Sequence, residues 1–485
     1  MLFTSYGFLI FFLAVFFLYW LLQKEKKWWK NWIILVASYV FYGIADWKMI
    51  PLLAVATIIF YWLGIGIRSA ATDKRSNAYK IIGIVLGVGT LVYFKYFNFF
   101  VLSFSDMFSA MGLQVNLPTF NIIIPLGVSY FTFKLISYVI DIYNEELEPC
   151  RNFVVFAGYV AFFPTILAGP IDRPKAFISQ LQVNRRFDYA LAVDGCRQIL
   201  WGLFKKIVVA DNCTRAIDAC FVGEQVPASL YLVAAIFSMI QLYADFSGYS
   251  DMAIGLSKLL GLNVTKNFSY PFFATNIAEF WRRWHMSLTK WMTDYVFTPL
   301  NFLLRKWGKV GLIVAIIVNM LVVGLWHGAN WTYAVFGLYH GLLFVPLIIL
   351  GRMDVKQSER TIKFGLPHPL MFIKMLCIFA LCTCGMVFLS SETITDAVQY
   401  FAAMFDSPFF DCRDDVVVQY RPMLKVSLFI FFMLIVEWYN REKEYGLEIS
   451  RIKHKWLRWC MYILVTLMVC IFTPQETTPF IYFQF

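Results

Sequence analysis

Apolar runs long enough to cross a lipid bilayer recur along this 485-residue chain, and short clusters of lysine and arginine separate them. A helix needs about 20 apolar residues to cross the hydrocarbon core of a bilayer. Hydrophobic residues make up 60% of the chain and aromatic residues 19%, far from the balance of a water-soluble globular protein. Backbone polar groups inside a bilayer must be satisfied within the spanning segment. The runs therefore predict an all-α, polytopic membrane protein.

The predicted spans follow one another with basic clusters at their inner ends. Residues 1–22 are interpreted as an uncleaved first span with its N-terminus outside, because a cluster of lysines follows them. Further spans are expected at residues 31–67 (a pair), 81–100, 333–350, 372–389, 425–439 and 459–473, and residues 312–326 form a shorter apolar run. We treat residues 1–485 as a single integral-membrane domain. Its core motifs lie in residues 125–341, and residues 370–485 hold the C-terminal spans and an outward tail.

The central part of the chain is less regular. Proline and glycine interrupt the apolar runs of residues 125–260, which predicts short or re-entrant helices, although each break taken alone is better interpreted as an ordinary loop. Residues 202–206 predict an amphipathic helix at the inner membrane surface. Asp245 and Asp251 lie four residues from Tyr249 and Ser247, so we expect local hydrogen bonds in a structural polar network rather than a catalytic pair.

The composition disfavours several other classes of protein. The net charge of +11 comes from clusters between apolar runs, so it indicates membrane topology and no nucleic-acid partner. Most of the ten cysteines lie in apolar segments, and no Cys-x-x-Cys pair or histidine at ligand spacing accompanies them. We therefore expect no metal site and no disulfide framework. No internal repeat is evident, which disfavours the inverted-repeat transporters.

Three of the five histidines fall between residues 279 and 340. If residues 279–288 form one helix, Trp284, His285 and Leu288 share a face, and His285 points inward among tryptophans. For His285 taken alone, the better interpretation is an interfacial aromatic helix with a hydrogen-bonded core histidine. A second histidine, His327, falls in the same stretch of sequence. General base or acid catalysis by His285 is therefore a competing interpretation.

His327 follows a short apolar run. Residues 312–326 rise only about 22 Å as a helix, whereas the hydrocarbon core is about 30 Å thick. We therefore expect the run to end inside the membrane, with a turn at residues 328–330 and a return span at 333–350. Irregular backbone at that depth is tolerated only in protein or beside a wet cavity, which predicts His327 at the floor of a funnel. An ionisable group in such a place is a candidate functional residue.

Two aromatic motifs resemble a known family. Trp-Arg-Arg-Trp-His at residues 281–285 and Trp-His-Gly-Ala-Asn-Trp at residues 326–331 resemble the membrane-bound O-acyltransferases (MBOAT), in the alginate O-acetyltransferase-like branch. Weaker resemblances lie at residues 125–143, 163–173, 243–255, 337–341 and 480–485. The resemblance implies a ring of transmembrane helices around a thin core, with short or re-entrant helices and a tunnel. The family's invariant histidine matches His327, and its second histidine matches His285.

The resemblance also implies an activity. A member of this branch is an O-acyltransferase that moves an acyl group, most often acetyl, from acetyl-CoA across the bacterial cytoplasmic (inner) membrane. The recipient is an extracytoplasmic polysaccharide, reached through a separate SGNH-type acetyltransferase. Acetyl-CoA acts as a donor substrate and not as a bound cofactor. This agrees with the residues, because an imidazole in a confined site can activate the hydroxyl that attacks a thioester.

The C-terminal tail contains a tyrosine, Tyr482, among aromatic residues. An aromatic anchor at the membrane interface is the common role of such residues. The tail also resembles the tyrosine-containing motif that carries an acyl group as a phenolic ester in related export systems. A phenolate leaves more readily than an aliphatic alkoxide, so such an ester would stay activated for onward transfer.

Other functions remain open at this point. Residues 169–173 resemble the teichoic-acid D-alanyl transfer branch, which leaves the acyl donor open. Acyl transfer to a membrane lipid would need no extracytoplasmic partner. A transporter or channel would use His285 and His327 as a proton relay and would move solute without consuming a thioester.

Overall fold

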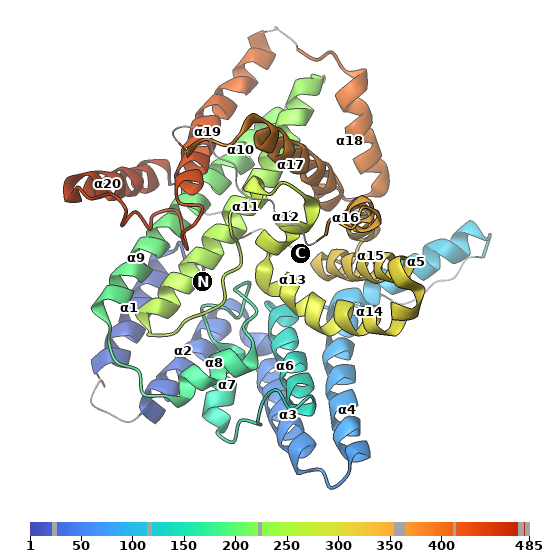
Figure 1. Cartoon of the computed structure of the whole chain (residues 1–485), viewed down its shortest axis with the longest axis vertical. Helices are drawn as coiled ribbons and strands as arrows, with labels where there is room; N and C mark the ends of the chain where they lie inside the picture. Colours follow the sequence, from blue (N-terminus) through green and yellow to red (C-terminus); the bar gives the residue numbers. More distant parts are fainter. Residues whose placement is uncertain are drawn as a thin grey trace. The chain divides into compact units, whose positions relative to one another are not determined.

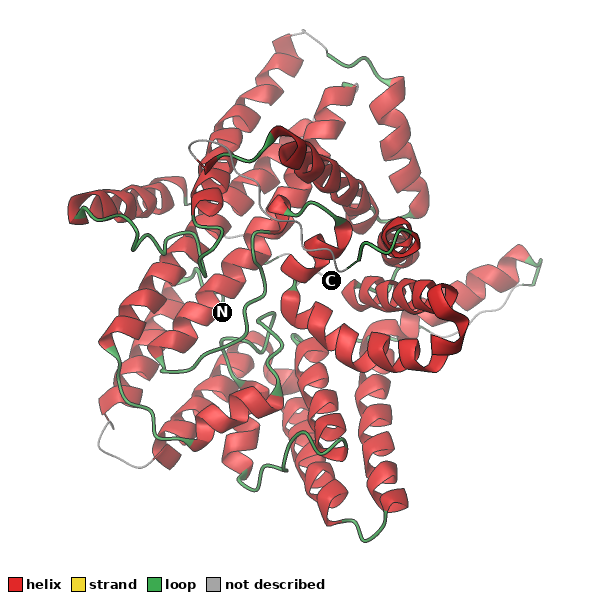
Figure 2. Ribbon diagram, in the orientation of Figure 1, coloured by secondary structure: helices red, strands yellow, loops and turns green. Residues whose placement is uncertain are grey.

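The computed structural model describes residues 1–21, 27–113, 119–221, 226–353, 365–410 and 414–473, together with Phe480. These residues form twenty α-helices, and no β-strand occurs among them (Figure 2). Eight helical segments of this part of the chain are long and apolar enough to cross a membrane. The predicted all-α, polytopic membrane protein is therefore confirmed. The helices group into two compact units, residues 1–195 with 253–265 and residues 196–252 with 266–485.

The first unit contains most of the N-terminal helices (Figure 1). They are α1 (Tyr6–Leu21), α2 (Lys27–Asp46), α3 (Ile50–Ser69), α4 (Asp73–Leu91), α5 (Phe97–Ala110), α6 (Val128–Tyr143), α7 (Phe153–Ala161), α8 (Pro174–Gln182) and the start of α9 (Tyr189–Leu203). The predicted pair of spans at residues 31–67 is confirmed as α2 and α3, which a 3₁₀ turn at Trp47–Met49 separates. The predicted first span is shorter than expected, because the 16 residues of α1 rise only about 24 Å.

The second unit contains the remaining helices. They are α10 (Asp211–Cys220), α11 (Ala228–Leu259, whose last turns belong to the first unit), α12 (Ile277–Arg283), α13 (Met286–Met292), α14 (Thr298–Leu304), α15 (Gly308–His327), α16 (Trp331–Ile349), α17 (Pro369–Ser390), α18 (Ile394–Asp406), α19 (Asp414–Tyr439) and α20 (Lys455–Phe472). The single-domain organisation, the ring and its tunnel stay predictions.

The irregular part of the first unit has the short helices that its proline and glycine content predicts. Helices α7 and α8 have only nine residues each, and the turns between them are buried. Gly127 has a φ of +72°, and a Cβ there would lie 2.3 Å from the carbonyl oxygen of Ile166. Only glycine fits this position, because it accepts a positive φ and lets the two backbones touch. The prediction of short helices is confirmed.

Helices α15 and α16 form a close hairpin in the second unit (Figure 1). A Cβ on Gly324 would lie 2.2 Å from the carbonyl oxygen of Tyr333, so glycine is required for the helices to approach this closely. Helix α15 has 20 residues and rises about 30 Å, because it begins before the apolar run and includes Lys309. The Nζ of Lys309 donates to the carbonyl oxygen of Ile349 at 3.0 Å. The helix is therefore longer than the apolar run, and the end of the run inside the membrane stays a prediction.

Candidate active site

His285 lies at a break between two short helices, so the prediction of one helix over residues 279–288 was wrong. Helix α12 ends at Arg283 and α13 begins at Met286, with a φ of +42° at His285. Backbone bonds to a neighbouring extended segment interrupt the helix: Met286 donates to Asn267 at 2.8 Å, and Ser269 donates to Arg283 at 2.9 Å. A left-handed conformation costs a residue other than glycine about 1–2 kcal/mol, and such strain collects at functional sites.

The His285 ring is fully buried among aromatic rings. Its centroid lies 4.7 Å from the Phe246 ring, which it meets edge-on, and 5.6 Å from the Trp326 ring. Burial, and after it the neighbouring His327, lowers the pKa of His285 well below its usual value. His285 thus packs against Trp326, the tryptophan next to His327 in sequence.

His327 is the last residue of α15 and is buried. Its ring lies 5.1 Å from the Trp326 ring and 5.9 Å from the Phe336 ring, which it meets edge-on. The helix ends here because Gly328 is extended and sits directly against the ring of Tyr333. The site of His327 thus lies at a helix end, with aromatic side chains around it.

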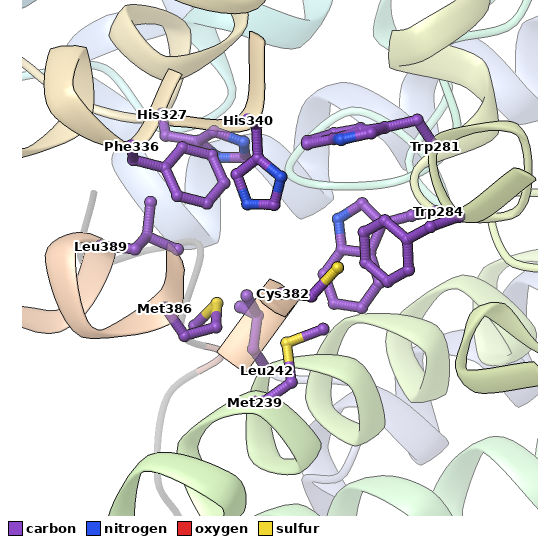
Figure 3. A pocket seen from close by; sticks show the side chains of 11 residues that line it. Met239, Leu242, Trp281, Trp284, His327, Phe336, His340, Cys382, Met386 and Leu389 are labelled. Carbon is purple, nitrogen blue, oxygen red and sulfur yellow. The ribbon is translucent and has the colours of Figure 1, made fainter. Parts of the chain in front are cut away.

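His327 opens onto a narrow pocket within the second unit, which we call the histidine pocket (Figure 3). Helices α11, α12, α15, α16 and α17, together with the α12–α13 break, line it with Met239, Leu242, Phe280, Trp281, Trp284, His327, Phe336, His340, Cys382, Met386 and Leu389. The space open to the centre of a water molecule is ≈ 10 Å³, about what one water needs. The lining of the pocket is therefore largely apolar, and its titratable groups are two imidazoles and one thiol.

Sequence reasoning missed His340 as a site residue. It lies on α16 and is buried, and its ring contacts the Phe336 ring at 4.6 Å and the Trp281 ring at 5.2 Å. Figure 3 shows it beside His327 and Phe336, facing the two tryptophans. The available signal was its membership in the histidine-rich stretch, one helical turn after Phe336. His285 does not line the pocket, but its ring lies 5.6 Å from the ring of Trp326, the residue before His327.

The predicted network around Asp245 and Asp251 is an ion cluster rather than a set of local hydrogen bonds. Lys205 pairs with Asp251 at 2.6 Å, and Lys206 pairs with Asp211 at 2.8 Å and Asp245 at 2.6 Å. Both lysines are buried, on a π-helical turn at Phe204–Ala210. The prediction of a surface amphipathic helix at residues 202–206 was therefore wrong. The two lysines can be buried because carboxylates on α10 and α11 neutralise their charges, and this depends on contacts between separate helices.

The third predicted site residue, Tyr482, lies outside the described residues. Its neighbour Phe480 is described and is buried in the second unit. The Phe480 ring lies 4.6 Å from the Nζ of Lys206 and meets the Tyr249 ring edge-on at 4.8 Å. Phe480 therefore docks on the ion cluster.

Among the described residues, no three His, Cys, Asp or Glu side chains converge in a way that could hold a metal ion. The titratable nitrogen groups that line the histidine pocket are the imidazoles of His327 and His340. A neutral imidazole can accept a proton through one nitrogen and donate a hydrogen bond through the other. The arrangement can activate a hydroxyl group away from bulk water.

Comparisons with known proteins agree with this chemistry. The family profile of the membrane-bound O-acyltransferases matches residues 146–358. The chain is 31% identical to the probable alginate O-acetylase AlgI of Pseudomonas putida over 100% of both chains. It is 30% identical to the peptidoglycan O-acetyltransferase of Helicobacter pylori, over 83% of this chain and 80% of the relative. It is 34% identical to the teichoic acid D-alanyltransferase of Bacillus subtilis, over 47% of this chain and 60% of the relative.

Proposed function

This chain belongs to the membrane-bound O-acyltransferase family and is an O-acyltransferase with several membrane spans. We propose the following reaction for it. The enzyme moves an acetyl group from acetyl-CoA on the inner side of the bacterial cytoplasmic membrane to an extracytoplasmic polysaccharide. The observation that carries this proposal is the buried position of His327 in an aromatic pocket. Among the relatives, the acetyl-transferring proteins are matched over most of the chain, whereas the D-alanyltransferase is matched over less than half.

His327 acts as the general base in this proposal. It takes the proton of the acceptor hydroxyl while that oxygen attacks the thioester carbonyl carbon, and the C–O bond forms. Collapse of the tetrahedral intermediate breaks the C–S bond, and the coenzyme A thiolate takes the proton back from His327. The aromatic and aliphatic walls exclude water, which would otherwise hydrolyse the thioester.

His285 supports this base from a neighbouring position. Its ring packs against Trp326, which in turn contacts the ring of His327. We assign it the role of positioning the tryptophan and relaying a proton. Its buried, strained backbone position favours a functional role over a packing role, because strain of this kind persists where function requires it.

Tyr482 is the acceptor hydroxyl in this proposal and carries the acetyl group as a phenolic ester to an SGNH-type partner outside. The position of Phe480 supports this proposal, because this residue, two positions before Tyr482, is buried against Lys206 and Tyr249 in the second unit.

A tail variant tests this step. Tyr482→Phe keeps the aromatic ring and removes only the oxygen, so we expect the final polysaccharide to lose its acetylation. Mass spectrometry of the wild-type protein incubated with acetyl-CoA is expected to find one acetyl group on the C-terminal peptide. Acetylated polymer at wild-type levels in the variant would mean direct transfer from coenzyme A to the partner.

The donor and the reaction class are tested in liposomes. Purified protein is given radiolabelled acetyl-CoA on one side, and we expect thioester consumption and label transfer that D-alanine thioesters do not support. Solute flux without thioester loss would identify a transporter with a histidine relay. Label in the lipid fraction, with no extracytoplasmic partner present, would identify a lipid acyltransferase.

A further inference from the structure

We propose that His340 is a second catalytic residue, which donates a hydrogen bond from Nδ1 to the thioester carbonyl oxygen while His327 acts as base. The inference rests on the proposed acyl transfer and assigns the group that stabilises its negative charge. The carbonyl oxygen gains that charge when the hydroxyl attacks, and a positioned donor is usually the largest single contribution to such a reaction.

The first observation is the place of His340. It lines the histidine pocket together with His327, on the neighbouring helix of the same hairpin (Figure 3). Phe336 contacts both imidazoles, with its ring 5.9 Å from the His327 ring and 4.6 Å from the His340 ring. A group that binds beside Phe336 can therefore meet both histidines at once.

The second observation is the hydrogen bonding of His340. The residue is 2% exposed, and its buried Nδ1 has no hydrogen-bond partner among the described residues. A core histidine with a purely structural role normally bonds to a neighbouring group, because burying an unsatisfied polar atom is unfavourable. A substrate oxygen that binds in the pocket would supply the missing partner.

The third observation is the space reserved for this ring. Gly385 on α17 faces the other side of His340, and a Cβ there would lie 2.5 Å from its Nε2. Glycine at this position therefore lets the imidazole occupy its place in the pocket. Met239 and Met386 form flexible parts of the wall, which can move when the carbonyl group enters.

The reaction step balances with both histidines in place. The acceptor oxygen bonds to the carbonyl carbon, its proton passes to His327, and the electron pair of the C=O π bond moves to the oxygen. His340 holds that oxyanion with its Nδ1–H and keeps its own proton. The pair then returns to form C=O, the C–S bond breaks, and the thiolate takes the proton from His327.

Three variants of His340 test the donor. The amide of Asn reproduces the position of Nδ1, that of Gln approaches the position of Nε2, and Leu has no donor. We expect kcat for acetyl transfer to fall about 100- to 1,000-fold in His340→Leu, with the KM for acetyl-CoA nearly unchanged, since one oxyanion donor contributes about that factor. We expect the kcat of His340→Asn to be at least ten-fold higher than that of His340→Leu. The kcat of His340→Gln should lie between those of the other two variants.

The results separate this inference from the proposed function. If wild-type protein transfers no acetyl group from acetyl-CoA, the proposed function fails. If wild-type protein is active and His327→Ala is inactive, but His340→Leu is as active as wild type, only the role of His340 fails. A His340→Asn variant as slow as His340→Leu, at equal protein levels in the membrane, would also overturn that role.

A substitution outside the pocket lining gives an independent test. Gly385→Ala removes no polar group, but its methyl group must displace the His340 ring, so we expect kcat to fall at least ten-fold. Gly89→Ala is the matched control, because a Cβ there meets nothing within 4 Å. Equal activity of the Gly385→Ala and Gly89→Ala variants would overturn the role of His340.

Discussion

The second unit buries polar side chains in two regions that are built in opposite ways. In the ion cluster, Lys205 and Lys206 each meet a carboxylate at 2.6 Å. In the histidine pocket, imidazoles face aromatic rings, and Nδ1 of His340 has no hydrogen-bond partner among the described residues. In the ion cluster, each lysine is fixed by the carboxylate that neutralises it. In the histidine pocket, a nitrogen without a partner in the described part of the chain is available to form a hydrogen bond with a substrate. This difference agrees with a structural role for the ion cluster and with the catalytic role that we propose for the histidine pocket.

The two regions are also connected through α11. Asp245 belongs to the ion cluster, and the next residue, Phe246, packs edge-on against His285 at 4.7 Å. Helix α11 therefore carries both a structural anchor and a wall of the site. The following predictions separate these roles, because a loss of stability and a loss of turnover are measured differently.

Removal of the base is expected to have the largest effect. His327→Ala should lower acetyl transfer by about 100- to 10,000-fold, the usual contribution of a general base. The protein level in the membrane should be unchanged. His454→Ala serves as the matched control, because this histidine is exposed in the loop before α20. If the His327→Ala and His454→Ala variants acetylate at the same level, His327 is not the general base and the histidine pocket is not the active site.

Breaking the ion cluster should act on stability instead. Lys205→Met leaves Asp251 buried without its cation, which we expect to cost about 3–5 kcal/mol of the free energy of unfolding. Thermal unfolding in detergent and the membrane level measure this effect, while turnover per folded molecule should stay near that of wild type. Arg451→Met removes an ion pair of the same 2.6 Å length between exposed side chains and should change little. Normal stability with lost turnover in Lys205→Met would reverse the assignment of the two regions.

His285 contacts residues next to both regions, Phe246 beside Asp245 and Trp326 beside His327. A substitution of His285 shows whether this residue acts in catalysis or in packing. His285→Gln keeps the ability to form hydrogen bonds but cannot titrate, so we expect weak residual transfer, about 100-fold below wild type. Stability should change less than in Lys205→Met, because no charge is left unpaired. Full transfer activity in this variant would make His285 a packing residue.

The smallest effect is expected from a substitution in the α15–α16 hairpin, which carries His327 and His340. Gly324→Ala pushes a methyl group against the carbonyl oxygen of Tyr333, so α15 and α16 must separate. Overpacking of this kind costs about 1–3 kcal/mol and would shift His327 relative to His340. Gly7→Ala is the control, because a Cβ there meets nothing within 4 Å. A Gly324→Ala protein as stable and active as Gly7→Ala would mean that the close approach is dispensable.

The sequence by itself determined the class of this protein and the location of its candidate site. Span length follows from the thickness of the hydrocarbon core, so apolar runs predict membrane helices without any knowledge of packing. The concentration of histidines between residues 279 and 340 identified His327, which the structure brings into a pocket. The irregular helices before residue 200 also followed from local causes, since proline and glycine act on the backbone directly.

The tertiary structure decided the features that depend on partners far along the chain. His285 leaves the helix because Asn267, 18 residues earlier, binds the backbone of Met286. Lys205 is buried because Ser247 and Asp251 on another helix receive its ammonium group. His340 takes its place in the lining of the pocket because Gly385 on α17 leaves room for its ring. Periodicity describes only neighbours three or four residues apart, so contacts between distant segments emerged only when the helices packed.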